Sequence, residues 1–231
     1  MSERERKAAK EDFQIPLGDR AVSAIWHEAQ NAIAVVAIAH GAGNDMRHPF
    51  FEGIAEGLAA EAVSALRFNF PYAEAGRKAP DRPAVLIDAW RAALEVAEGR
   101  GAGIPVIASG KSLGGRMASM VAADDGDSFI GRGLVFFGYP LHAPGRTEQL
   151  RDAHLSKVQV PMLFIQGDGD SLARFDLIKR VVERLKPLAR LHPIEGGDHS
   201  FRVRRTKRPD FDIGFELAKV AAPFIGEVAR R

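Results

Sequence analysis

The sequence contains no cysteine among its 231 residues. Disulfides, thiolate metal sites and a cysteine nucleophile are therefore excluded, and a reducing cytoplasm is the expected location. The formal charge of +2 is too small to indicate nucleic-acid binding by itself. The longest uninterrupted apolar run covers residues 32–39, far short of the roughly 20 residues that a membrane span needs. We therefore expect no nucleic acid and no membrane as a partner, and the oligomeric state is left open.

The N-terminal segment, residues 1–12, mixes charges of both signs and lacks the apolar stretch of a signal peptide. We expect it to be a flexible tail. The remaining residues, 13–231, are enough to bury a substantial core and match the ordinary size of one α/β domain. The domain organisation predicted is therefore a tail followed by a single domain.

Short apolar runs alternate with amphipathic stretches along this domain. The expected hairpin covers 13–17 and 21–26, the later strands 32–39, 63–70, 106–108, 133–139, 160–166 and 190–194, and the helices 50–62, 84–98, 175–185, 210–228 and a stretch that starts at 116. This alternation predicts an α/β fold with a mainly parallel sheet and helices on both faces. No insertion is long enough for a lid domain, so we expect a shallow pocket built from loops.

The run Gly110-Lys111-Ser112-Leu113-Gly114 lies between an apolar strand and a helix-compatible stretch. This is the G-x-S-x-G pattern of a nucleophile elbow, with Ser112 at the tip of a strained turn. A phosphate-binding loop also ends in Gly-Lys-Ser, but its first glycine would fall on Pro105. The apolar residues that follow Pro105 also cannot form an open phosphate-cradling loop, so the elbow is the better interpretation.

A serine hydroxyl needs a base to remove its proton and an acid to orient that base. In an elbow hydrolase the chain order is Ser, then Asp or Glu, then His. Ser112, Asp170 and His199 follow this order, each directly after a predicted strand. Asp168 is the alternative acid, and we favour Asp170. Two buried carboxylates this close would repel each other, so Asp168 is expected to face solvent.

Further stretches strengthen the pattern, and together they resemble a known family. They are His40-Gly-Ala-Gly43, Arg67-Phe-Asn-Phe-Pro-Tyr72, Gly110-Lys-Ser-Leu-Gly-Gly-Arg116, Gly138-Tyr-Pro-Leu141, Gln166-Gly167 and Gly196-Gly-Asp-His-Ser-Phe201. The chain resembles the α/β-hydrolases, and within them the small dienelactone-hydrolase-like enzymes. More closely, it resembles the branch that includes the hydrolase-like subunit of the animal non-specific-lethal chromatin complex and uncharacterised bacterial relatives.

The resemblance implies an α/β-hydrolase fold with Ser112 as nucleophile and His199 as base. It places one oxyanion donor in the turn from His40 to Gly43, at Ala42 with Gly43 as the alternative, while the second is expected at Leu113, where the elbow helix begins. Members of the branch usually read Gly-Thr-Arg-Asp where this chain reads Gly167-Asp168-Gly169-Asp170. Position for position, Asp170 takes the place of the acid of these relatives. The difference from the usual motif lies at Asp168 and Gly169, which replace the threonine and the arginine.

The predicted function is that of a serine hydrolase, carboxylesterase-like, cleaving a small-molecule ester without cofactor or metal. The alternative is a catalytically silent hydrolase fold that serves as a protein-interaction module. A metal site at His40, Asp45 and His48 is disfavoured, because loop structure explains these residues better. The basic segment from Arg202 to Arg208 is either a solvated loop or a site that attracts acidic substrates or partners.

Overall fold

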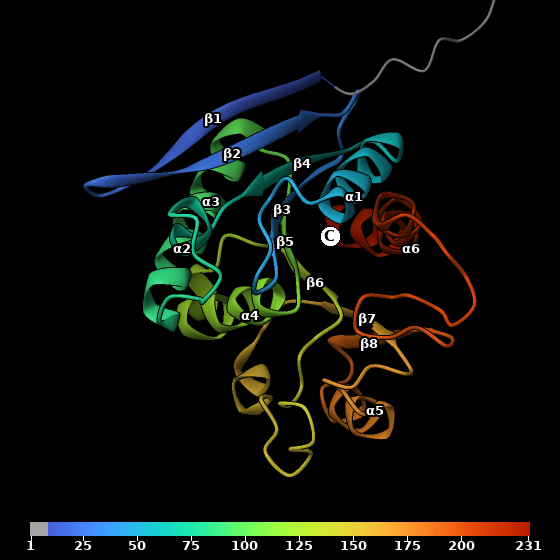
Figure 1. Ribbon diagram of the computed structural model, residues 1–231. Coiled ribbons are helices and arrows are strands. Elements are labelled where there is room, and N and C mark those ends of the chain that lie inside the picture. The colour runs from blue at the N-terminus through green and yellow to red at the C-terminus, as the bar shows by residue number, and fades with distance from the viewer. Residues whose placement is uncertain (1–8) are drawn as a thin grey trace, which may run out of the picture.

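A single eight-stranded sheet runs through the centre of the protein in the computed structural model, which describes residues 9–231 (Figure 1). The strand order is β1-β2-β4-β3-β5-β6-β7-β8, in which β1, β2 and β4 pair antiparallel and β3 to β8 run parallel. The strands are β1 Ala9–Leu17, β2 Arg20–Glu28, β3 Ala34–Ala39, β4 Val63–Phe68, β5 Val106–Lys111, β6 Gly133–Phe137, β7 Met162–Gly167 and β8 Ala189–Ile194.

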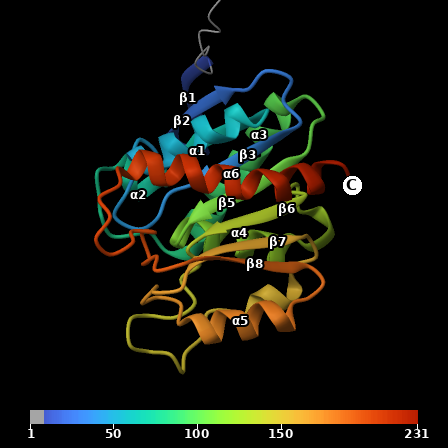
Figure 2. The same cartoon turned by 90° about the vertical axis from the view of Figure 1, so that its right-hand side faces the viewer.

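Helices cover both faces of the sheet, as the alternating sequence pattern predicts. Helices α1 and α6 lie together on one face, and α3 and α4 lie on the other (Figures 1 and 2). Helix α5 packs beside β8, at the far end from the hairpin. The helices are α1 Pro49–Ala60, α2 Pro71–Glu74, α3 Pro83–Gly101, α4 Leu113–Asp125, α5 Phe175–Arg184 and α6 Asp210–Ala229.

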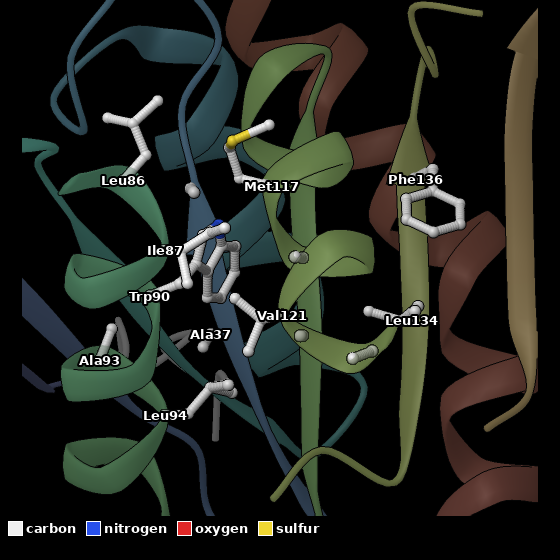
Figure 3. Packing of buried hydrophobic residues seen from close by; sticks show 14 of the residues in the cluster. Ala37, Leu86, Ile87, Trp90, Ala93, Leu94, Met117, Val121, Leu134 and Phe136 are labelled. Atoms are coloured by element: carbon white, nitrogen blue, oxygen red, sulfur yellow. The ribbon is translucent and has the colours of Figure 1, made fainter. Parts of the chain in front are cut away.

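The core forms two hydrophobic clusters, one on each face of the sheet. On the α3 and α4 side, Trp90 lies between the two helices and Ala37 of β3 (Figure 3). Every residue of β3, β4, β5, β6 and β7 is buried. Strands buried on both faces read as continuous apolar runs, which is why the sequence marks them so clearly.

The N-terminal hairpin is longer than the sequence suggests, because β1 begins at Ala9 rather than after residue 12. Its charged residues find partners on other elements: Lys10 Nζ lies 2.7 Å from Glu52 Oε1, and Arg100 donates to Glu11 at 2.8 and 2.9 Å. Charge pairing thus lets a polar segment join the sheet edge. The rest of the expected tail, residues 1–8, lies outside the described residues.

The polar, proline-rich stretch 72–83, for which the sequence predicts a loop, overlaps at its start with the short helix α2. Pro71 opens this helix, where its missing N–H costs nothing. Glu74 ends it and accepts hydrogen bonds from Ser23 and from Asn69 Nδ2. The bonds from Ser23 connect α2 to β2, and the bond from Asn69 connects it to the residue that follows β4 by one position. Among the described helices, none is long and apolar enough to cross a membrane.

Candidate active site

Ser112 lies at the junction between β5 and α4, between Lys111 at the end of the strand and Leu113 at the start of the helix. Its backbone has φ 51° and ψ −114°, a combination that costs free energy for any residue with a Cβ. The Ser112 N–H donates to the carbonyl of Phe137 at 3.2 Å, which holds the turn against β6. The result is a strained elbow that presents the serine side chain at the carboxyl edge of the sheet.

The flanking glycines make this elbow possible because its backbone packs closely. A Cβ on Gly110 would lie 2.5 Å from the carbonyl carbon of Gly114, and one on Gly114 would lie 2.7 Å from the carbonyl oxygen of His40. Real Cβ atoms do not approach other atoms this closely. Trp90 Nε1 donates to the Gly114 carbonyl at 3.0 Å, so α3 also supports the first turn of α4.

The three residues predicted from chain order come together at this elbow. Ser112 Oγ lies 2.9 Å from His199 Nε2, and His199 Nδ1 lies 2.7 Å from Asp170 Oδ2. A carboxylate accepts only, so the imidazole donates from Nδ1 and leaves Nε2 free to accept the Ser112 proton. The His199 side chain is 23% exposed and the Asp170 side chain is fully buried. The hydroxyl end of this relay therefore faces solvent, while its acid end is enclosed.

Asp170 is held by two donors besides His199. The Leu172 N–H donates to Asp170 Oδ1 at 2.7 Å, and Gln166 Nε2 donates to Asp170 Oδ2 at 2.5 Å. Gln166 Oε1 in turn accepts from the Tyr139 N–H at 2.8 Å, which connects Asp170 to the segment that follows β6. Gln166 is a residue of this site to which the sequence pattern gives no role. The available signal was a polar side chain at the end of an otherwise apolar strand.

Asp168 occupies a different environment from Asp170, although only one residue separates them. Its side chain is on an exposed residue and accepts a hydrogen bond from the Gly196 N–H at 2.8 Å. This bond supports the turn that leads from β8 toward His199. The solvent-facing position expected for Asp168 is therefore observed, and the two carboxylates point to different partners.

His40 fixes the loop that contains Ala42 through hydrogen bonds of both its ring nitrogens. His40 Nε2 accepts from the Phe70 N–H at 3.1 Å, and Nδ1 donates to the Gly41 carbonyl at 2.9 Å. Burial lowers the pKa of His40, so the ring stays neutral and keeps both bonds. Tyr72 also donates to the Gly41 carbonyl, at 3.2 Å. His40 is thus a structural residue of the turn.

Gly41 packs directly against the elbow, because a Cβ placed on it would lie 3.6 Å from Ser112 Cβ. This contact brings the turn that carries Ala42, the next residue, to the side of the serine. The Leu113 N–H belongs to the first turn of α4, where backbone donors have no partner within the helix. Both expected oxyanion donors therefore lie on segments that border Ser112.

Lys111 is a buried cation next to this site, and the sequence pattern gives no role to its side chain. Its Nζ lies 5.6 Å from the centre of the Phe201 ring. Burial lowers the pKa of Lys111 to about 8, while Asp170 and Asp198 oppose the shift. A Cβ on Gly138 would lie 3.1 Å from Lys111 Nζ and 3.6 Å from His199 Cε1. The ammonium and the imidazole therefore border the same glycine.

Other polar residues singled out from the sequence have structural partners. Within residues 9–231, no group of three or more His, Asp or Glu side chains could hold a metal ion. His48 Nδ1 accepts from the Phe50 N–H and so caps α1. Arg67 donates from Nε to His27 Nε2 at 3.0 Å and from Nη1 to the Met46 carbonyl at 2.6 Å. These contacts account for Arg67 as a buried structural residue.

Solved structures with the same architecture include several hydrolases. A dienelactone hydrolase from Anabaena variabilis is 20% identical with a TM-score of 0.77, and the match covers 96% of this chain and 99% of that one. A serine hydrolase homologue from Coxiella burnetii is 19% identical with a TM-score of 0.73, covering 93% and 97%. A serine hydrolase without lid from Xanthomonas campestris is 18% identical with a TM-score of 0.67, covering 94% and 93%.

At these identities the likeness concerns the fold, and it includes proteins of the dienelactone-hydrolase type. The narrower branch with the chromatin-complex subunit stays a prediction. The family model described as "Alpha/beta hydrolase domain" matches residues 32–224, which is most of the chain. The predicted fold class is confirmed by this match together with the mostly parallel sheet. The chain belongs to the alpha/beta hydrolase domain family.

Proposed function

We propose that the protein is a serine hydrolase that cleaves an ester-like bond of a small molecule. The observation that carries this proposal is the relay from Ser112 Oγ to His199 Nε2 and from His199 Nδ1 to Asp170, at 2.9 and 2.7 Å. The strained backbone of Ser112 supports the same role, because such strain is concentrated at functional sites. A fold used only for binding needs no such alignment.

In this mechanism, His199 takes the proton of Ser112 as the hydroxyl attacks the ester carbonyl. Asp170 keeps Nδ1 protonated and stabilises the imidazolium that forms. The N–H groups of Leu113 and Ala42 donate to the oxyanion, where a single well-placed donor is worth about 3 kcal/mol. His199 then protonates the leaving alcohol, and water, activated by the same base, releases the acyl group from Ser112. The chain's own residues supply every step.

Within residues 9–231 no separate domain covers the elbow, and this supports a proposal for the substrate class. Within the described residues, the segments at the carboxyl edge of the sheet are turns and loops with short helical pieces. We therefore propose small or accessible esters as substrates, and place the protein in the cytoplasm in keeping with its lack of cysteine.

The test is labelling by a fluorophosphonate probe, which reacts with an activated serine whatever the substrate. Wild-type protein is expected to label under conditions in which a known serine hydrolase labels. The Ser112→Ala variant is expected not to label, while Ser109→Ala serves as a control, because Ser109 is buried and donates to the Val135 carbonyl. An unlabelled wild type would favour the silent interaction module, and labelling of Ser112→Ala would refute the nucleophile.

A further inference from the structure

A pocket of about 440 Å³ lies between helix α6 and the segment that follows His199. In Figure 1 this segment is the orange-red loop that returns to the start of α6. The volume falls in the range of small-molecule sites. The lining contains none of Ser112, Asp170 and His199, and consists of Ile194, Phe201, Arg202, Val203, Thr206, Lys207, Arg208, Ile213, Glu216, Leu217 and Val220.

The floor of this pocket is apolar and firmly held. Phe201, Ile213 and Leu217 are each at most 4% exposed, so their side chains belong to the core on the α1 and α6 face. Phe201 adopts φ 62°, a strained value for an aromatic residue, and its ring stacks on Phe50 with the centroids 6.2 Å apart. Such a residue keeps its conformation only where its surroundings fix it. The floor is therefore a preformed apolar surface.

The rim of the pocket carries a surplus of positive charge. Arg202 pairs with Asp210 at 2.9 Å, and Glu216 pairs with Lys219 at 3.4 Å, so these two lining charges are compensated. Lys207 and Arg208 form no ion pair within residues 9–231. Arg208 has only a long bond from Nη2 to the Asp212 carbonyl, at 3.5 Å. Two cations thus stand uncompensated beside an apolar floor.

We propose that this pocket binds an aliphatic carboxylate. The alkyl chain of the ligand would cover the floor made by Phe201, Ile213 and Leu217, and the carboxylate would accept hydrogen bonds from Lys207 and Arg208. A neutral alkyl compound would leave the cations unpaired, and a small inorganic anion would make no contact with the apolar lining. The site is separate from the elbow, yet its ligand would touch Phe201, two residues from His199.

The binding test uses decanoate below its micelle concentration, measured by isothermal titration calorimetry at physiological salt. The Lys207→Glu, Arg208→Glu double variant is expected to bind at least about tenfold more weakly, since a charge-assisted bond contributes about 1.5 kcal/mol or more. Arg204→Glu, Arg205→Glu is the matched control, because it makes the same charge change in the same segment outside the pocket. It is expected to change the affinity less than threefold, since exposed charges are screened.

Further measurements test whether the alkyl chain of the ligand is needed and whether the ligand binds in this pocket. Val220→Asp, which places a carboxylate beside the floor, is expected to abolish decanoate binding, and acetate and decyltrimethylammonium are expected not to bind. Protein phosphonylated at Ser112 is expected to bind decanoate with unchanged affinity. Circular dichroism and thermal melting verify that each variant is folded.

The proposal is overturned if wild-type protein binds no decanoate, or if the two double variants lose affinity equally. It is also overturned if binding survives Val220→Asp or disappears on phosphonylation, which would place the ligand in the catalytic pocket. A failure of the proposed hydrolase function would appear separately, as the absence of phosphonylation, and would leave the Val220 and Lys207 results to decide this site.

Discussion

Gln166 offers a sharp test of how the candidate acid is held. It is fully buried at the end of β7 and bonds to both Asp170 and Tyr139. Replacing it by leucine keeps a similar volume but removes both hydrogen bonds. The Tyr139 N–H then stays buried without its partner, and Asp170 keeps only the donors Leu172 N–H and His199 Nδ1.

The expected loss in the free energy of unfolding follows from the two lost hydrogen bonds. A buried donor left unsatisfied costs about 1–3 kcal/mol, and a bond to a charged acceptor contributes about 1.5–3 kcal/mol. The added apolar burial of leucine offsets about 1 kcal/mol, so the net loss for Gln166→Leu is about 3 kcal/mol. For a chain of this length each kcal/mol lowers the melting temperature by about 2–4 °C, so a drop of about 6–12 °C is expected.

The assay combines thermal melting with the rate of fluorophosphonate labelling at a temperature where the variant is fully folded. Labelling of Gln166→Leu is expected to slow about tenfold, because 1.4 kcal/mol of lost orientation of Asp170 is a factor of ten in rate. Gln149→Leu, the same change on an exposed loop residue, is the control. It is expected to alter neither the melting temperature nor the labelling rate. A Gln166→Leu variant within 2 °C of wild type, labelling at the wild-type rate, would refute this reasoning.

Two other predictions concern charge. Asp170→Asn should slow fluorophosphonate labelling by about 10³-fold or more, because an amide at this position favours the wrong tautomer of His199. The labelling rate of Asp168→Asn should stay within about threefold of wild type. An equal loss in both variants would contradict the choice of Asp170 as the acid. Burial lowers the pKa of His27 to about 3, with Arg67 adding to the shift. The unfolded chain therefore takes up this proton below about pH 6.5, while the folded chain does not. Between pH 7 and 4.5 the free energy of unfolding should fall by about 2.5 kcal/mol from this residue. His27→Gln keeps an acceptor for Arg67 without titrating, so urea unfolding at both pH values should show a smaller loss, and an unchanged loss would exclude His27 as the cause.

Much of the architecture could be predicted because buried parallel strands and amphipathic helices leave strong periodic patterns. The strand that leads to Ser112 and the order of Ser112, Asp170 and His199 were both readable in this way. The extent of β1 was not, since residues 9–12 are charged and join the sheet only through partners such as Glu52 and Arg100. Such pairing depends on contacts between residues far apart in the chain.

The sequence by itself determined the type of fold, the elbow and the candidate nucleophile, because these depend on local patterns of glycine, polarity and chain order. The sequence favoured Asp170 over Asp168, but only the tertiary structure decided what each carboxylate contacts: Asp170 lies against His199, and Asp168 accepts from the Gly196 N–H. It also decided that Gln166 donates to Asp170 and that Lys111 is buried close to His199. These are properties of segments brought together at the edge of a parallel sheet, where direction and burial arise from packing.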